Sequence, residues 1–475
     1  MGNCYLLRDA TGLDQLPRLR ELRLGASSLS DPARLPAVQR LAALTRLNLS
    51  ARLSELPASV AMPASLVDLS IAVGKGAPPA AMLATCDSLV SLRLCGKFAL
   101  LPSEYSLLPS LTCLDLPGVG LVQLPENVGE LRSLQRLYLH GNHLYGLPAS
   151  VSNLRQLEEC RLDEQSPQPS AFKDVTLDEQ FQSSRRQNGA RLIEGAIMLP
   201  AMTSLVLGGE YGNNEKLCVH EELPPGLFSH PTLTHLTCRA CGVVTLKIGG
   251  DSSRLQVLRL GRNRIAALPE EFGSLQSLRQ LSLDENALVV LPASLGQLHA
   301  LRVLNVARNE LRELPASLGH LTDLRALQVD HNRLTTLPGL HAMSRLKVLV
   351  ACDNQIKSLE PICNSTSLVV LVLFRNDIRE LPSELARLTQ LIWLDLEENA
   401  ITTVRKAVVN MALPRAEHVR MDAPVMHVLN KAKSRLLRMQ PRPAKYVEGN
   451  VRAFHEADEA DLREKHPVLT WGIFV

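Results

Sequence analysis

The chain has 475 residues, 45% of them hydrophobic and 21% charged, and its formal net charge is only +3. This near balance argues against a nucleic-acid partner, because proteins that bind a phosphate backbone usually carry a strong basic excess. No apolar run reaches the roughly 18 to 20 residues of a transmembrane helix, and the first residues lack the basic and apolar regions of a secretory signal. We therefore expect a soluble, cytoplasmic protein whose ten cysteines are reduced.

Leucine supplies about 90 residues, whereas the 8 Phe, 6 Tyr and 2 Trp are few for this length. Length alone suggests about three domains of roughly 150 residues each. A core built almost wholly from one aliphatic side chain instead favours one small packing unit used many times.

A repeat of 22 or 23 residues accounts for most of the chain. Its pattern is L-x-x-L-x-L-x-x-N-x-L, followed by Leu-Pro, a polar turn and Leu/Phe-Gly-x-Leu. Copies are predicted to begin at Leu19, Leu44, Leu66, Leu89, Leu111, Leu134, Leu157, Met202, Leu233, Leu255, Leu278, Leu301, Leu324, Leu346, Leu368 and Leu391, with a degenerate copy at Ala416. The sequence therefore predicts one solenoid of about sixteen repeats over residues 19–426.

This pattern resembles that of leucine-rich repeat proteins, whose repeat has roughly 20 to 29 residues. Its second half is similar to the intracellular subgroup that includes Ras-pathway scaffolds, plant intracellular Ras-group-related proteins and Scribble-type polarity proteins. The resemblance implies an α/β repeat fold, a horseshoe-shaped solenoid with a concave parallel β-sheet and a convex side of irregular, 3-10 or short helical segments. It also implies protein partners on the concave face.

Residues 1–18 precede the first repeat and are predicted to form an N-terminal cap. Gly2 and Cys4 resemble the lipidation sites of a myristoylated and palmitoylated terminus, but Leu6 stands where the motif requires Ser or Thr. The alternative, which we favour, is an unmodified cap packed on the first repeat. One acyl chain anchors only marginally, so membrane association is expected only if both residues are acylated.

Two insertions interrupt the repeats, near residues 163–200 and 208–222. The first is polar enough for a projecting loop or a short helix. Long insertions are often functional or disordered loops, although a tolerated surface insertion is the simpler interpretation.

The later repeats are the most regular, and the strand alternation places both leucines of each L-x-L inside the solenoid. The ninth position is always asparagine, at Asn263, Asn286, Asn309, Asn332, Asn354, Asn376 and Asn399. We expect each amide to bond backbone groups of adjacent turns. Among the earlier copies only Asn142 keeps this residue, so the N-terminal half is expected to be less regular.

Signatures of catalysis and of cofactor binding are missing from the sequence. There is no phosphate loop and no HExxH or GxSxG motif. Cys238 and Cys241 form a CxxC pair, which could hold a metal or act in redox chemistry. In the repeat register, however, they occupy a core position and the asparagine position, and no second ligand pair at zinc spacing follows. We predict no catalytic, cofactor or metal residues.

The outward strand positions predict where a protein partner binds. They combine mixed charges, which suit a protein with patterned charge, with an apolar patch near the C-terminal end. The predicted contact residues are Arg259, Asp284, Arg308, Asp330, His331, Val350, Val372, Phe374, Arg375, Trp393, Asp395 and Glu397. Two alternatives stay open: a solvated face whose cross-strand pairs support each other, or an apolar patch covered by the chain's own tail.

Residues 427–475 leave the repeat pattern and are predicted to form a C-terminal cap helix and tail. Helical spacing of apolar residues continues to Met439, with basic residues mostly on the opposite side. Taken together, the sequence and the resemblance predict a non-catalytic intracellular adaptor or scaffold of a signalling pathway. A structural subunit of a cytoskeletal or ciliary assembly and a substrate-recognition subunit of a ubiquitin ligase are the alternatives.

Overall fold

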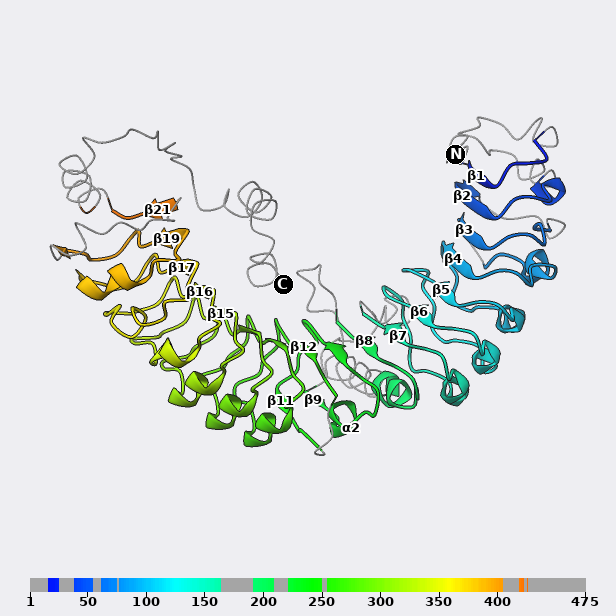
Figure 1. Ribbon diagram of the computed structural model, residues 1–475. Coiled ribbons are helices and arrows are strands. Elements are labelled where there is room, and N and C mark those ends of the chain that lie inside the picture. The colour runs from blue at the N-terminus through cyan, green and yellow to red at the C-terminus, as the bar shows by residue number, and fades with distance from the viewer. Residues whose placement is uncertain are drawn as a thin grey trace, which may run out of the picture. The chain divides into compact units, whose positions relative to one another are not determined.

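The computed structural model describes residues 16–24, 38–53, 61–74, 77–163, 191–208, 221–249, 254–404, 418–422 and 425. The chain forms two compact units, Met1–Val243 (unit 1) and Val244–Val475 (unit 2). Each unit is a stack of turns with parallel strands along its inner side and short helices along its outer side (Figure 1). The single solenoid over residues 19–426 stays a prediction.

Several predicted segments lie outside the described residues. These are most of the N-terminal cap with Gly2 and Cys4, the tail over 427–475, and the central parts of both insertions, 164–190 and 209–220. Residues 191–197, at the end of the first insertion, are helical. Within the described residues, no helix has the length and apolar character needed to span a bilayer.

The described strands of unit 1 form a parallel sheet in chain order. They are β1 (Glu21–Leu24), β2 (Arg46–Leu53), β3 (Asp68–Val73), β4 (Ser91–Cys95), β5 (Cys113–Asp115), β6 (Arg136–Tyr138), β7 (Glu159–Arg161), β8 (Ser204–Val206) and β10 (His235–Thr237). The short strand β9 (Glu222–Leu223) and the helix α2 (Pro225–Phe228) precede β10.

The strands of unit 2 form a second run of parallel pairings in chain order. They are β12 (Val257–Arg259), β13 (Gln280–Ser282), β14 (Val303–Asn305), β15 (Ala326–Gln328), β16 (Val348–Val350), β17 (Val370–Val372), β19 (Trp393–Asp395) and β21 (His418–Arg420). The remaining strands are β11 (Thr245–Leu246) and the parallel pair β18 (Glu380–Leu381) and β20 (Thr403–Val404). In both units every strand of these runs begins two residues after a predicted repeat start, including the degenerate copy at Ala416.

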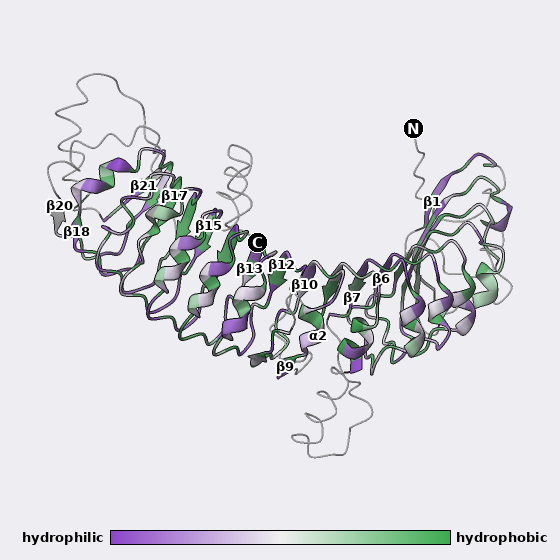
Figure 2. Ribbon diagram, turned by 60° about the horizontal axis from the view of Figure 1, so that its bottom comes forward, coloured by the Kyte–Doolittle hydropathy of each residue, from purple (hydrophilic) through white to green (hydrophobic). Residues whose placement is uncertain are grey.

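The core of each unit is the column of side chains at the middle position of the strands. In unit 2 these residues pair in register and are fully buried: Leu258, Leu281, Leu304, Leu327, Leu349, Leu371 and Leu394. Figure 2 shows hydrophobic residues recurring from turn to turn. Each turn thus buries its leucines against its neighbours, as the alternation predicts.

The outer side consists largely of one-turn 3-10 helices, which confirms the predicted convex side. They are η3 (Ala80–Leu83), η4 (Ser103–Leu107), η5 (Val128–Glu130), η6 (Ala149–Asn153), η8 (Glu270–Ser274), η9 (Ala293–Gln297), η10 (Ala316–His320), η11 (Leu340–Ala342) and η12 (Ser383–Arg387). Most follow directly on the proline of the Leu-Pro step, for example Pro292 before η9. Proline ends the extended segment because it cannot donate a ladder hydrogen bond, and its fixed φ suits a helix start.

The asparagine ladder is present as predicted. The Asn309 side-chain oxygen accepts a hydrogen bond from the Leu288 N–H at 3.0 Å. Its amide nitrogen donates to the carbonyls of Leu283 in the preceding turn and Val306 in its own turn, both at 3.0 Å. Asn142 makes the same bonds in unit 1. Each amide thereby satisfies backbone groups that the turn leaves unpaired and buried.

The residue before each ladder asparagine in unit 2 has a left-handed backbone, which the sequence did not indicate. The positions are Arg262, Glu285, Arg308, His331, Asp353, Arg375 and Glu398, with φ between 50° and 58°. Such a conformation costs a non-glycine residue about 1–3 kcal/mol. The asparagine bonds on the following residue offset that cost.

The prediction that all cysteines are reduced is wrong for one pair. Cys238 and Cys241 form a disulfide in unit 1, and both are buried. Their predicted core and asparagine positions explain why: the turn between β10 and the following segment brings the two side chains together inside the repeat. The other described cysteines are free thiols, at Cys86, Cys95, Cys113, Cys160, Cys352 and Cys363.

Candidate functional site

The predicted partner-binding residues lie on one surface of unit 2. We call this surface the sheet face. Counting from the first leucine of each repeat, it consists of the residues at positions three, five, seven and eight in the turns that contain β12 to β19. These residues lie on the opposite side of the strands from the leucine core. Neighbouring strands pair in register, so residues at one repeat position form a row across the sheet. The register therefore brings all twelve predicted residues onto a single surface.

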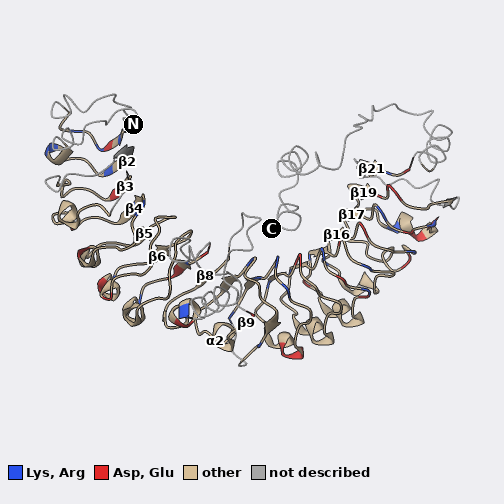
Figure 3. Cartoon of the chain, turned by 180° about the vertical axis from the view of Figure 1, so that it is seen from behind, with Lys and Arg blue, Asp and Glu red and all other residues tan. Residues whose placement is uncertain are grey.

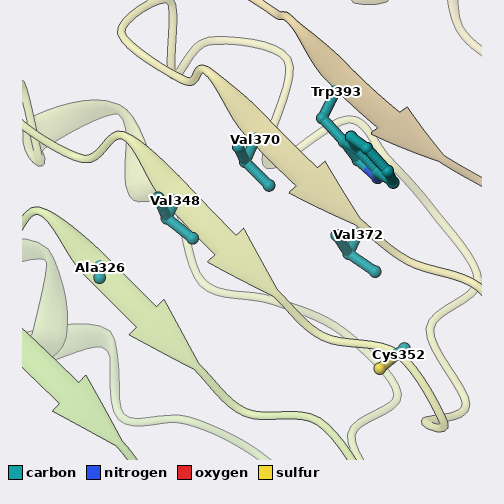
Figure 4. Close-up of a cluster of buried hydrophobic side chains, with 6 residues drawn as sticks. All are labelled: Ala326, Val348, Cys352, Val370, Val372 and Trp393. Carbon is teal, nitrogen blue, oxygen red and sulfur yellow. The ribbon is translucent and has the colours of Figure 1, made fainter. Parts of the chain in front are cut away.

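The apolar part of the sheet face is a compact cluster of six residues from four neighbouring turns (Figure 4). We call it the apolar cluster: Ala326, Val348, Cys352, Val370, Val372 and Trp393. Val350 and Phe374 are partly buried against it. The position of Trp393 on the face agrees with the prediction, but its exposure does not, since only 2% of the residue is accessible.

Two aromatic rings on this face are in contact with arginine. The Arg375 guanidinium carbon lies 5.7 Å from the centre of the Phe374 ring. The guanidinium carbon of Arg420, from β21, lies 5.5 Å from the Trp393 ring. Such cation–π contacts contribute about 0.5–1 kcal/mol at exposed sites. They place positive charge directly beside the apolar cluster.

The charged residues of the sheet face form ion pairs between adjacent turns. Arg262 Nε lies 3.1 Å from Glu285 Oε1, and Arg375 Nε lies 2.7 Å from Glu398 Oε2. Arg375 also lies 3.6 Å from Asp353. Figure 3 shows both Lys or Arg and Asp or Glu residues scattered among the other residues of the turns. These cross-strand pairs support one another and also give the surface a pattern of alternating charge.

Other predicted residues are more buried than a contact surface requires. Asp284 is buried and accepts a hydrogen bond from the Ser282 hydroxyl. Asp395 is buried and accepts a hydrogen bond from the Glu397 N–H at 3.1 Å. Arg308, in contrast, is exposed. Arg308, Phe374 and Arg375 are therefore the predicted residues best placed to touch a partner.

Burial raises the pKa of Asp395 to about 6, above the value of about 3.9 for an unfolded aspartate. The folded state therefore binds this proton more tightly, and the free energy of unfolding should fall as the pH rises from about 4 to about 7. At about 1.4 kcal/mol per pKa unit, the fall is at most about 3 kcal/mol. Urea unfolding at several pH values measures this dependence. In Asp395→Asn, the free energy of unfolding should no longer show the decrease that Asp395 causes. The exposed Asp377 provides the control, since Asp377→Asn should leave the profile unchanged; identical profiles for both variants would contradict the assignment.

Two features of the sheets were missed by sequence reasoning. In unit 1 a polar cavity of about 130 Å³ lies over β1 to β3, lined by Glu21, Arg23, Arg46, Asn48, Asp68 and Ser70 together with two leucines. In unit 2 Cys352 and Asp353 stand beside Asp330 and His331. The register places these residues at matching positions of neighbouring turns, so comparing adjacent repeats position by position would have found both features.

Comparison with known families supports the repeat pattern. A family profile described as "Leucine-rich repeat region" matches residues 221–356, and another described as "Leucine Rich Repeat" matches residues 133–154. No curated protein sequence matches the chain.

Solved structures with a similar fold include a leucine-rich repeat protein of Leptospira interrogans. It is 23% identical, the match covers 92% of this chain and 91% of that chain, and the TM-score is 0.59. A chain of the Toll–Spätzle complex from Drosophila is 19% identical over 83% of this chain and 52% of that chain, with a TM-score of 0.57. At these identities the likeness concerns the fold.

Proposed function

The chain is a leucine-rich repeat protein, and on that premise we propose that it is a non-catalytic intracellular adaptor whose sheet face in unit 2 binds a protein partner. Leucine-rich repeats indicate a protein-interaction domain. The Drosophila chain of similar fold was solved in a complex, that of Toll and Spätzle.

The observation that supports this proposal is the combination of charge and aromatic groups on one rigid surface. Arg375 stands over the Phe374 ring and pairs with Glu398, and exposed Arg308 lies three turns away. Interface centres are enriched in arginine and aromatic residues, while alternating charges select a partner with a complementary pattern. Asparagine bonds fix the backbone beneath them, so little ordering entropy is lost on binding.

Charge reversal on the sheet face should separate a binding surface from a merely solvated one. We expect Arg308→Glu with Arg375→Glu to reduce partner recovery in quantitative affinity purification by at least about tenfold, because like charges across an interface cost several kcal/mol. The matched control is Arg264→Glu with Arg312→Glu. Both control arginines are exposed and lie outside the strands, Arg264 directly after Asn263 and Arg312 three residues after Asn309. The change in net charge is the same.

The control should retain the partners that the wild-type protein recovers. Equal recovery by both double variants, or equal loss from both, would contradict the sheet face as the binding surface. Circular dichroism of each purified variant checks that the repeat is still folded.

A further inference from the structure

Four side chains that can ligate a metal form a two-by-two arrangement on the sheet face of unit 2. Asp330 and His331 follow β15, and Cys352 and Asp353 follow β16 at the same two repeat positions. One ligand atom each of Asp330, His331 and Cys352 lies within 4.8 Å of the other two. His331 Nε2 is 3.4 Å from Asp353 Oδ2. The arrangement thus offers a nitrogen, a sulfur and carboxylate oxygens around one point.

The donors are confined to these two turns. The same repeat positions carry Ala307 and Arg308 in the preceding turn, and Phe374 and Arg375 in the following one. In the part of the chain that the structure describes, this is the one group of three or more His, Cys, Asp or Glu side chains with ligand atoms so close together. The general charge pattern of the sheet face therefore does not explain it.

The backbone beneath the group is held in place from both turns. The His331 N–H donates to the Cys352 carbonyl at 2.9 Å, which joins the two turns at this point. The Asn332 amide donates to the Asp330 carbonyl at 3.1 Å, and the Asn354 amide donates to the Cys352 carbonyl at 3.0 Å. The ladder asparagines thus fix the positions from which the ligand side chains extend.

A buried carboxylate oxygen gives an independent indication of a ligand. Asp353 Oδ2 is inaccessible to solvent and makes no hydrogen bond with the described residues, while Oδ1 lies 3.6 Å from Arg375. The 3.4 Å approach of His331 to Oδ2 does not have hydrogen-bond geometry. Buried polar atoms are normally satisfied, so this oxygen is available to a cation.

The electrostatic environment of the Cys352 thiol also suits a cation. The residue is 5% exposed, and the carboxylates of Asp330, Asp353 and Asp395 lie near it. The negative field of these carboxylates favours a divalent cation. Binding would release the thiol proton to solvent as the sulfur becomes a ligand.

We propose that Asp330, His331 and Cys352 form a Zn²⁺-binding site on the sheet face, with Asp353 beside them. Zinc accepts nitrogen, sulfur and oxygen donors together, whereas calcium and magnesium require oxygen ligands. Tetrahedral ligands at roughly 2.0–2.3 Å from zinc lie roughly 3.3–3.8 Å apart. Small side-chain rotations on the fixed backbone would bring the ligand atoms, now within 4.8 Å of one another, into that range. The fourth ligand is Asp353, water or a group from a partner.

Cobalt titration of the full-length protein tests the site without any partner. Purified protein, stripped of metal and with the Cys238–Cys241 disulfide intact, is titrated with Co²⁺ alone, whose thiolate complexes absorb in the near ultraviolet. We expect one equivalent to produce the absorption and one equivalent of Zn²⁺ to abolish it. Cys352→Ala should abolish the thiolate absorption, and His331→Gln should weaken Co²⁺ binding by at least about tenfold.

The matched controls are Cys363→Ala, another buried free thiol of unit 2, and His320→Gln on η10. Both should leave the titration unchanged. Absence of the absorption in the wild-type protein, or its persistence in Cys352→Ala, would overturn the proposal. Because the His331 side chain is 38% exposed, His331→Gln is tolerated structurally and keeps the test valid if Cys352→Ala fails to fold.

Discussion

Asn309→Ala is expected to lower the free energy of unfolding by about 3–5 kcal/mol. The residue is 8% exposed. Removing its side chain leaves the Leu288 N–H without its acceptor. The carbonyls of Leu283, Val306 and Ala307 each lose one of two donors. A buried group left unsatisfied costs about 1–3 kcal/mol and each further lost hydrogen bond about 0.5–1.5 kcal/mol, and partial access of water reduces the sum. Equilibrium urea unfolding followed by circular dichroism measures the difference.

Asn305 in the same turn provides the control. Its side-chain oxygen accepts one hydrogen bond, from the Ala307 N–H at 3.0 Å, and the residue is half-buried on the sheet face. Asn305→Ala should therefore cost about 1 kcal/mol or less. If the two variants lose equal stability, the ladder does not hold the turns together in the way described.

Gly296→Ala should destabilise unit 2 by about 1–3 kcal/mol, because the added methyl group has no space. Gly296 lies in η9, and a Cβ there would lie 2.3 Å from the Ser317 carbonyl oxygen and 2.8 Å from its carbonyl carbon. Both atoms belong to the backbone of the next turn. A side chain could rotate away from the added methyl group, but a backbone carbonyl cannot. The turn that contains Ser317 would therefore have to move. Urea unfolding of the variant measures the loss.

Gly319 occupies the same place in the next repeat and gives a matched control. The nearest atom to a Cβ at this position is the Gly339 carbonyl oxygen, at 3.6 Å. Gly319→Ala should therefore be neutral, or stabilising by up to about 1 kcal/mol, because it restricts the unfolded chain. A loss of stability as large as that of Gly296→Ala would show that close packing between the 3-10 helices is not the cause.

The strands and the ladder could be predicted because they depend on local pattern. Leu258 and Leu281 are buried and lie opposite each other in neighbouring strands. Alternate residues of a strand point to the same side, and that periodicity is visible in the sequence. Asn309 bonds its neighbours because its place in the repeat puts it inside the turn. The starts of the repeats then fix which residues share the sheet face.

Features that depend on contacts between turns could not be predicted in this way. Arg262 and His331 adopt left-handed backbones, although local preference favours glycine or asparagine there. Trp393 stands at an outward position and is nevertheless buried in the apolar cluster. The proximity of Cys352 to His331 arises from the pairing of two repeats, because neither repeat alone contains a complete set of ligands.

Site-specific photo-crosslinking in cells tests most directly whether the sheet face of unit 2 binds a protein. A photoreactive phenylalanine replaces Gln280, a neutral, half-buried residue of β13 on that face, or His320, an exposed residue at the end of η10 on the outer side. We predict a discrete protein adduct from position 280 and none from position 320. Adducts from position 320 alone, or from neither position, would contradict the account.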